Sequence, residues 1–315
     1  MSLVDDVLRY NSVSIVGTAK NTGKTVCLNY LLRNIPSAIS AGVTSIGVDG
    51  ESTDAVTNTS KPEVFLKQGM YFNTSETHYR DRQLVSEIVG LSTISSSLGR
   101  YVTARVICDG NIKLSGPSSI NDLIEWKNKA KQLPISLFLI DGAASRLSSA
   151  SPYATDAFIL CTGAAAYPKV ETLVQQTEYI VYLSQIDEIE REELEQSQCI
   201  SSFEEVKDIF PLKKKCYTIT GALTDKLVNI VLKQESSGVT LVVKDFTKLF
   251  VSKEVYHRFI KKGCRLAVEK KAKLIAVCIN PTSPYGNSMI SSNVRKLLSL
   301  KVNVPVIDIF DYDET

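Results

Sequence analysis

The sequence predicts an α/β protein with a doubly wound, mostly parallel sheet, and three observations support this class. Short apolar runs rich in β-branched residues alternate with longer helical segments along the 315 residues. These runs are apolar on both faces, which is typical of parallel strands covered by helices on each side. The composition, 44% hydrophobic and 22% charged, is ordinary for a globular enzyme.

The apolar runs define the expected strands in chain order, and helices fill most of the gaps between them. The expected strands are Val13–Val16, Thr44–Val48, Tyr101–Cys108, Ser136–Ile140, Ala157–Cys161, Tyr179–Leu183, Cys216–Ile219, Val239–Val243, Leu274–Ile279 and Val304–Ile309. Two turns break the alternation and predict hairpins. One joins Val64–Leu66 to Met70–Asn73, and the other joins Ala104–Cys108 to Ile112–Leu114 through Asp109-Gly110.

The charge balance excludes some classes of partner. There are 36 Lys and Arg against 34 Asp and Glu, a net charge of +2, which gives no support to nucleic-acid or membrane-surface binding. No apolar run has the length of a membrane span, and no signal segment opens the chain. The seven cysteines stand singly, without a Cys-x-x-Cys pair. We therefore expect a cytoplasmic protein with neither disulfides nor a zinc site.

A glycine-containing loop lies between the first expected strand and a helix over Val26–Arg33. Its sequence ends in Gly-Lys-Thr, and the strand–loop–helix order is the context in which that triplet binds phosphate. Lys24 would place its charge near the β- and γ-phosphates, and the Thr25 hydroxyl would ligate Mg²⁺. The expected nucleotide contacts are Gly17, Thr18, Ala19, Lys20, Asn21, Thr22, Gly23, Lys24, Thr25 and Val26. For Lys20, a solvated loop lysine is the simpler interpretation.

Acidic residues after two other strands are the expected metal and catalytic groups. Asp141 follows the apolar run Leu137–Ile140, as a Walker B carboxylate does, and is predicted to hold Mg²⁺ with Thr25. An ordinary Asp-Gly turn is the alternative. Asp49 and Asp54 follow the second strand and are expected, with Lys24, to act at the γ-phosphate. A solvated turn would explain these acids equally well.

Three polar segments follow strands and would therefore meet at the ligand-binding edge of an open α/β sheet. They are Thr162-Gly163, Gly116–Ser119 and Asn280–Gly286. Taken alone, each is explained more simply as a helix cap or a turn than as a ligand contact.

The loop begins one residue earlier than the usual phosphate loop, because Gly17 precedes Thr18 at the position normally held by glycine. This form is similar to the loop of dethiobiotin synthetase-type P-loop proteins. Further strings, over 14–25, 42–51, 54–57, 139–143 and 280–286, resemble the P-loop subunit of lysine 5,6-aminomutase reactivases. The resemblance carries chemical roles only to Gly17–Thr25 and Asp141.

That resemblance implies an ATP- and Mg²⁺-dependent reactivation factor for an adenosylcobalamin-dependent lysine aminomutase. The mutase and a second reactivase subunit would be its partners, and the sequence leaves a homodimer open. The absence of an Asn-Lys-x-Asp motif favours adenine over guanine. No arginine or base is evident for the γ-phosphate, so the expected ATPase activity is weak or partner-stimulated. The alternative is an ATP-dependent small-molecule ligase or kinase, but Thr44–Val56 lacks the substrate-facing lysine that such an enzyme would use.

The length favours more than one domain. Residues 1–185 are predicted to form the P-loop nucleotide-binding domain. Residues 186–211, which contain the acidic helical stretch Asp187–Glu193, would form a connector. The remaining residues, 212–315, would form a C-terminal α/β part.

Overall fold

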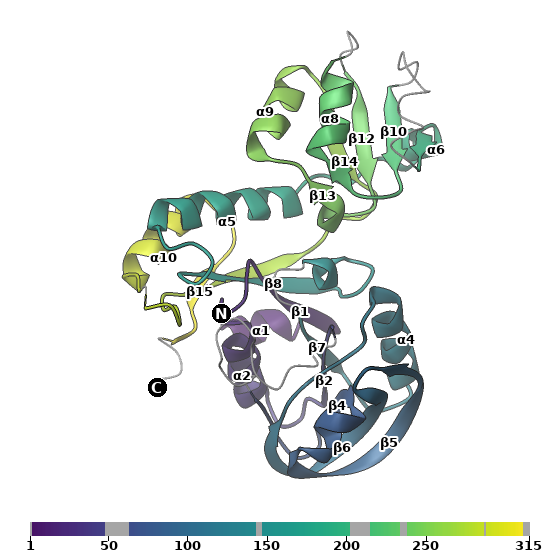
Figure 1. Ribbon diagram of the computed structural model, residues 1–315, viewed down its shortest axis with the longest axis vertical. Coiled ribbons are helices and arrows are strands. Elements are labelled where there is room, and N and C mark those ends of the chain that lie inside the picture. The colour runs from purple at the N-terminus through teal and green to yellow at the C-terminus, as the bar shows by residue number, and fades with distance from the viewer. Residues whose placement is uncertain are drawn as a thin grey trace. The chain divides into compact units, whose positions relative to one another are not determined.

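The computed structural model describes residues 2–47, 63–142, 147–201, 215–233, 238–286 and 288–310. It divides the chain into two compact units (Figure 1). Unit 1 contains residues 1–178 and 274–315, and unit 2 contains residues 179–273. The boundary between them falls within helix α5 (Val170–Ser184).

Unit 1 is built on a sheet of ten described strands. The path runs through β16 (Val306–Asp308), β15 (Leu274–Asn280), β8 (Ala157–Gly163), β1 (Ser12–Gly17), β7 (Leu137–Asp141), β2 (Ala41–Ser45), β4 (Tyr71–Ser75), β6 (Gly99–Ile112) and β3 (Val64–Leu66), with β5 (Gln83–Ser96) paired to β6. The pairings from β16 to β4 are parallel, and those of β6 are antiparallel. The predicted α/β class with a mostly parallel sheet is confirmed.

Helices cover both faces of this sheet. Along β7, Leu137 and Leu139 join the core formed with α1 (Leu3–Val7) and α2 (Lys24–Asn34). The alternate residues Phe138 and Ile140 join a second core under α4 (Ile120–Ala130). Successive strand residues point to opposite faces, so α1 and α2 cover one face and α4 covers the other (Figure 1). The other described helical elements that lie wholly within unit 1 are α3 (Glu76–Arg80), the 3-10 turn Ser148–Ala150 and α10 (Ser291–Ser299).

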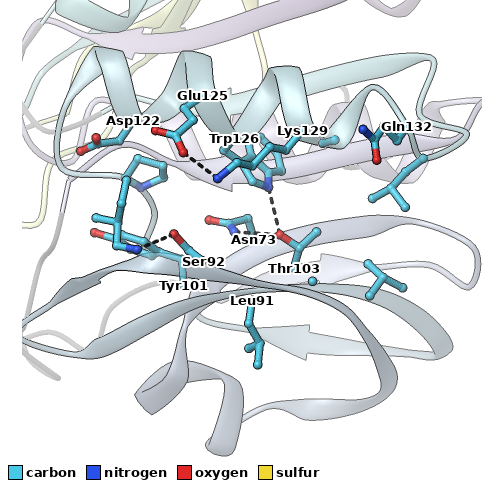
Figure 2. A pocket seen from close by; sticks show the side chains of 16 residues that line it. Asn73, Leu91, Ser92, Tyr101, Thr103, Asp122, Glu125, Trp126, Lys129 and Gln132 are labelled. Carbon is cyan, nitrogen blue, oxygen red and sulfur yellow. Dashed lines mark hydrogen bonds and ion pairs between the residues drawn. The ribbon is translucent and has the colours of Figure 1, made fainter.

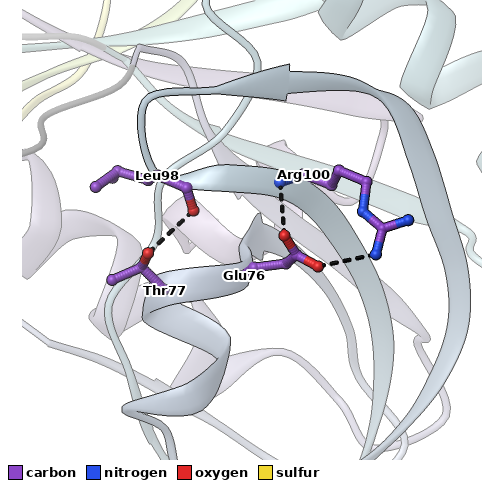
Figure 3. A network of polar contacts seen from close by, with 4 residues as sticks. All are labelled: Glu76, Thr77, Leu98 and Arg100. Atoms are coloured by element: carbon purple, nitrogen blue, oxygen red, sulfur yellow. Dashed lines mark hydrogen bonds and ion pairs between the residues drawn. The ribbon is translucent and has the colours of Figure 1, made fainter.

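The β5–β6 hairpin is attached to α3 at its tip (Figure 3). The Glu76 carboxylate accepts the Arg100 backbone N–H at 3.0 Å and the Arg100 guanidinium at 3.1 Å. These two interactions, the backbone one first, lower the pKa of Glu76. The Thr77 hydroxyl donates to the Leu98 carbonyl at 3.0 Å. Gly99 has a φ of +87°, and a Cβ there would lie 2.6 Å from Glu76 Oε2, so both the turn and its attachment require glycine.

Both predicted hairpins are wrong. Strands β3 and β4 do not pair with each other, because each pairs with β6. The Asp109-Gly110 pair lies within β6 rather than at a turn. Asp109 instead accepts the Gln68 backbone N–H at 2.7 Å. The segment Lys67–Met70 does form a turn, in which the Met70 N–H donates to the Lys67 carbonyl at 3.1 Å, but β6 inserts between the two strands that it joins. Long-range pairing thus decides which strands are neighbours.

Two predicted strands need correction. Tyr179–Leu183 belongs to α5, whose buried residues Leu173, Thr177, Val181 and Ser184 recur at helical spacing. The strand predicted at Thr44–Val48 is β2, which begins earlier, at Ala41. Gly42 fits there because a Cβ would lie only 3.0 Å from Ile135.

Unit 2 contains a parallel sheet in the order β14 (Arg265–Val268), β12 (Thr240–Val243), β10 (Cys216–Ile219) and β9 (Gln198–Ile200). The other described elements that lie wholly within unit 2 are α6 (Arg191–Glu195), α8 (Asp225–Leu232), the 3-10 turn Phe246–Lys248, α9 (Lys253–Lys261) and the short parallel pair β11 (Leu223–Thr224) and β13 (Leu249–Phe250). No described helix is long and apolar enough to cross a membrane.

The predicted domain boundaries differ from these units. The predicted connector, 186–211, belongs to unit 2, because β9 pairs with β10 and Glu188 forms a bridge with Val268. The predicted C-terminal part, 212–315, is divided. Its last strands, β15 and β16, join β8 in the sheet of unit 1. Sequence order does not reveal this return, since β15 is as apolar as a strand of either sheet.

Candidate functional site

The loop after β1 leaves the middle of the sheet in unit 1. All six residues of β1 are buried, and the strand pairs in parallel with β7 on one side and β8 on the other. The Thr18 N–H donates to the Cys161 carbonyl at 3.0 Å, which continues the pairing with β8 into the loop. The loop thus lies outside the carboxyl ends of parallel strands, where open α/β sheets bind ligands.

The backbone of this loop makes a tight turn before α2 begins. Asn21 and Gly23 both have positive φ, at 60° and 89°. A Cβ on Gly23 would lie 3.3 Å from the Asn280 Cβ, and a Cβ on Gly17 would lie 2.4 Å from the Thr22 hydroxyl oxygen. Both glycines are therefore required for a close approach, and Gly23 also for its backbone conformation.

The Lys24 side chain folds back over the loop. Its ammonium donates to the Ala19 carbonyl at 3.0 Å, and the Thr22 hydroxyl donates to the same carbonyl at 3.0 Å. The ammonium also lies against Gly17, since a Cβ built there would be 3.0 Å from Lys24 Nζ. A positive charge is thus held within the loop, half-buried, at the point where α2 starts.

The first turn of α2 is open to an anion. The N-cap residue, Gly23, makes no side-chain cap, and the first turn contains no acidic residue. The first N–H bonded within the helix is that of Cys27, which donates to the Gly23 carbonyl at 2.9 Å. The preceding N–H groups and the positive end of the helix dipole favour a negatively charged ligand.

The two predicted metal ligands lie at the same edge of the sheet. Asp141 is the last residue of β7 and pairs in register with Ile15 of β1, while Thr25 is the second residue of α2. Both are half-buried. No group of three His, Cys, Asp or Glu among the described residues could hold a metal by itself. Mg²⁺ at this edge would take its other ligands from phosphate and water, as Mg²⁺ sites commonly do.

The other residues predicted to act at the nucleotide lie in different settings. Asp49 and Asp54 lie outside the described residues, so their catalytic role stays a prediction. Val26, predicted to contact nucleotide, is half-buried in the first turn of α2 and packs against the core. Lys20 lies in the loop and is exposed.

The structure brings two distant strand ends to the loop. Asn280, the last residue of β15, donates through Nδ2 to the Asn21 carbonyl at 3.0 Å. Its Oδ1 accepts the N–H and the hydroxyl of Thr282 at 3.0 and 2.9 Å. From β8, the Thr162 hydroxyl accepts that of Thr18 at 3.4 Å. Sequence reasoning identified both as strand ends but missed their bracing of the loop, which depends on β15 returning to the sheet.

The third predicted segment lies at the end of β2. The Gly116 N–H donates to the Ser45 hydroxyl at 3.0 Å, and the Pro117 carbonyl accepts the Gly47 N–H at 2.8 Å. A Cβ on Gly116 would lie 1.7 Å from the Ser45 carbonyl oxygen, so only glycine fits here. This segment supports the chain directly before the predicted acidic residues.

Three buried cysteines meet where α2 packs on β8 and β15, and they were not anticipated as a cluster. Cys161 and Cys278 are register partners on β8 and β15, and Cys27 Sγ lies 3.9 Å from Cys278 Sγ. Interaction with Cys161 and Cys278, together with burial, raises the pKa of Cys27. Cys27 therefore remains a neutral thiol that packs as a small hydrophobe. Cys108, the last residue of the predicted apolar strand Tyr101–Cys108, is instead exposed on β6.

The site therefore combines a closed glycine loop, a folded-back lysine, an uncapped helix start and a neighbouring carboxylate. Comparison of the chain with protein-family models, with curated proteins and with solved structures found no match.

Proposed function

We propose that unit 1 binds Mg·ATP at Gly17–Thr25. The observation that carries the proposal is the position of Lys24, whose ammonium lies 3.0 Å from the Ala19 carbonyl inside the loop and beside the open start of α2. An incoming phosphate would offer this ammonium a charged acceptor in place of a neutral carbonyl. Charge-assisted hydrogen bonds are the stronger kind, so Lys24 would turn toward the phosphate.

The remaining residues have complementary roles in this proposal. Loop N–H groups and the first turn of α2 hold the β-phosphate, and Thr25 and Asp141 hold Mg²⁺ directly or through water. Asp49 or Asp54 completes the metal shell or positions a water at the γ-phosphate. Asn280 contributes indirectly, because its amide fixes the Asn21 carbonyl.

Isothermal titration with Mg·ATP tests this binding. We expect saturable, Mg²⁺-dependent binding to the full chain, with ATP preferred modestly over GTP because no guanine-reading motif is present. A tighter complex with GTP would reverse the nucleotide preference. No binding of either nucleotide would refute the proposal.

We further propose that nucleotide binding drives reactivation of an adenosylcobalamin-dependent lysine aminomutase, with a second reactivase subunit as companion. This part rests on the motif resemblance, in which the loop, Asp141 and Asn280–Gly286 all take part. The chain alone would be a weak ATPase, and its ATP and ADP states would differ near the predicted acidic segment.

A rescue assay tests the reactivation proposal. Inactivated mutase is supplied with ATP, Mg²⁺, fresh coenzyme and the companion subunit, with and without this chain. We expect activity to return only with the wild-type chain and not with Lys24→Ala. Equal rescue in its absence would refute the reactivase function and leave the small-molecule ligase or kinase as the function to test, by measuring phosphate release with candidate acids.

A further inference from the structure

Unit 1 contains a cavity of about 310 Å³ between α4 and the strands β4, β5 and β6 (Figure 2). Its volume is in the range of small-molecule sites. None of its lining residues belongs to the loop Gly17–Thr25. The cavity is therefore separate from the proposed nucleotide site, and its occupation does not depend on that proposal.

The strand side of the cavity presents hydroxyl groups. Thr103 Oγ1 accepts hydrogen bonds from Asn73 Nδ2 and from Trp126 Nε1, both at 3.1 Å (Figure 2). Both of its lone pairs are therefore used, and its own hydrogen is left to donate.

Tyr101, 3% exposed, also lines the cavity. Burial raises the pKa of Tyr101, partly offset by the nearby Ser96 and Ser118 hydroxyls. No described group reaches its hydroxyl at full hydrogen-bond geometry. The hydroxyl oxygen is itself fully buried, so Tyr101 contributes its ring rather than its hydroxyl to the cavity wall.

The rest of the wall is largely apolar and partly uncovered. Trp126 from α4 faces the hairpin, which contributes Val89 and Ile94. Leu91 also borders the cavity, but its side chain points away from α4 (Figure 2). Val89 is 39% exposed although it lines the cavity. An apolar molecule seated here would contact the indole and cover part of this surface.

The charges at the rim favour a cation. The Lys129 ammonium is bound to Glu125 at 2.6 Å, so these two charges offset each other. Asp122, which also lines the cavity, forms no ion pair with a described residue. Two carboxylates and one ammonium leave the rim with one negative charge, next to the face of Trp126.

We propose that this cavity binds a compact apolar ammonium compound. Its aromatic or branched alkyl body packs against Trp126 and the hairpin, its ammonium pairs with Asp122, and any polar substituent is bound by the Thr103 hydroxyl.

The experiment uses the full chain and its single tryptophan, Trp126. Three probes of matched shape differ in charge: 2-phenylethylammonium, 2-phenylethanol and 3-phenylpropionate. Tryptophan fluorescence follows each titration, and equilibrium dialysis measures binding independently of any fluorescence change. We expect saturable binding, with the ammonium about two- to fivefold tighter than the alcohol and the carboxylate weakest, because one partly exposed charge contributes modestly.

Two variants separate the charge from the cavity. Asp122→Asn should remove the preference for the ammonium without weakening the alcohol. Gly90→Val should weaken all three probes about fivefold or more, because its Cβ would lie 3.7 Å from the Thr103 Cβ and the new side chain would occupy cavity space. Glu254→Gln, in the first turn of α9, is the matched charge control and should change nothing. Thermal unfolding verifies that each variant is folded.

Several results would overturn the proposal. Absence of saturable binding of all three probes by dialysis would show that the cavity is not a ligand site. Equal or tighter binding of the carboxylate, or an ammonium preference that survives Asp122→Asn, would refute the cationic class. Full binding by folded Gly90→Val would place the probes elsewhere.

Discussion

The starts of α2 in unit 1 and α8 in unit 2 provide an internal comparison. Each helix follows a strand whose partners are parallel, β1 before α2 and β11 before α8, and neither N-cap residue, Gly23 or Thr224, makes a side-chain cap. They differ in the first helical residue. α2 begins with Lys24 and has no acidic residue in its first turn, whereas α8 begins with Asp225.

The two helix starts therefore have side chains of opposite charge. The Asp225 carboxylate accepts the Ser252 N–H at 2.7 Å and supplies a negative charge to the positive end of α8. The start of α2 instead has an ammonium beside its uncapped N–H groups and a glycine loop that permits close approach. An α/β sheet thus provides helix starts at its carboxyl edge in both units, and the side chains decide which one is left open to an external anion.

Among the predictions that test this comparison, replacement of Lys24 should have the largest effect, a loss of ATP affinity. Lys24→Ala removes one charge-assisted contact, worth about 1.5–3 kcal/mol, so ATP affinity should fall at least about tenfold. Isothermal titration measures the change. The matched control is Lys226→Ala in the first turn of α8, which should bind ATP as the wild type does. Equal affinities for all three proteins would show that the α2 start is not the phosphate site.

The carboxylate beside the loop should affect turnover more than binding. Asp141→Asn keeps the side-chain shape but removes the negative charge that holds Mg²⁺, so phosphate release, measured with the activating partner, should fall about tenfold while ATP still binds. Chelation of Mg²⁺ from the wild type should lower phosphate release in the same way. Wild-type turnover by Asp141→Asn would remove this residue from the metal site.

Gly23 and Gly238 both have positive φ, so a comparison of their alanine variants separates the effect of backbone strain from the effect of a steric contact. Gly23→Ala and Gly238→Ala both place a side chain at positive φ, 89° and 75°, and each should destabilise the fold by about 1–2 kcal/mol. Only the Gly23 Cβ meets a neighbour, Asn280 at 3.3 Å, whereas the Gly238 Cβ meets nothing within 4 Å. Because the backbone strain is of the same kind, chemical denaturation should show losses of stability of this size for both variants. Because only the Gly23 Cβ has a neighbour next to the loop, only Gly23→Ala should also lose ATP affinity. Equal affinity losses would attribute the effect to general destabilisation.

The sequence predicted the parallel strands of unit 1 better than its antiparallel edge. Strands such as β1, β7 and β8 are apolar on both faces, and a buried run of this kind has few other interpretations. β5 was missed because it is exposed along most of its length and carries no such run. Its pairing with β6 is set by a turn at Ser97-Leu98, which contains no strong turn dipeptide.

The candidate site shows the same division between local and distant information. The loop and its following helix could be found from the sequence, since their residues are contiguous. The contact of Asn280 with the loop and the cluster of Cys27, Cys161 and Cys278 could not be found in this way, because all of unit 2 separates β15 from the loop in the sequence. The cavity beside Trp126 depends on α4, β4 and the hairpin meeting, which periodicity alone does not specify.

The smallest expected effect concerns the other side of the comparison, the acidic start of α8. Asp225→Asn keeps an oxygen to accept the Ser252 N–H but removes the charge at the helix terminus, so unit 2 should lose about 0.3–1 kcal/mol of stability. ATP should not bind there, because the start of α8 lacks a loop like Gly17–Lys24, in which a lysine ammonium is held inside a tight glycine turn. Chemical denaturation of Asp225→Asn measures the stability. ATP titration is made on the double variant Asp225→Asn, Lys24→Ala, in which Lys24→Ala weakens binding at the α2 site. Recovery of ATP binding in that double variant would mean that removal of a negative charge is sufficient and that the loop chemistry is not required.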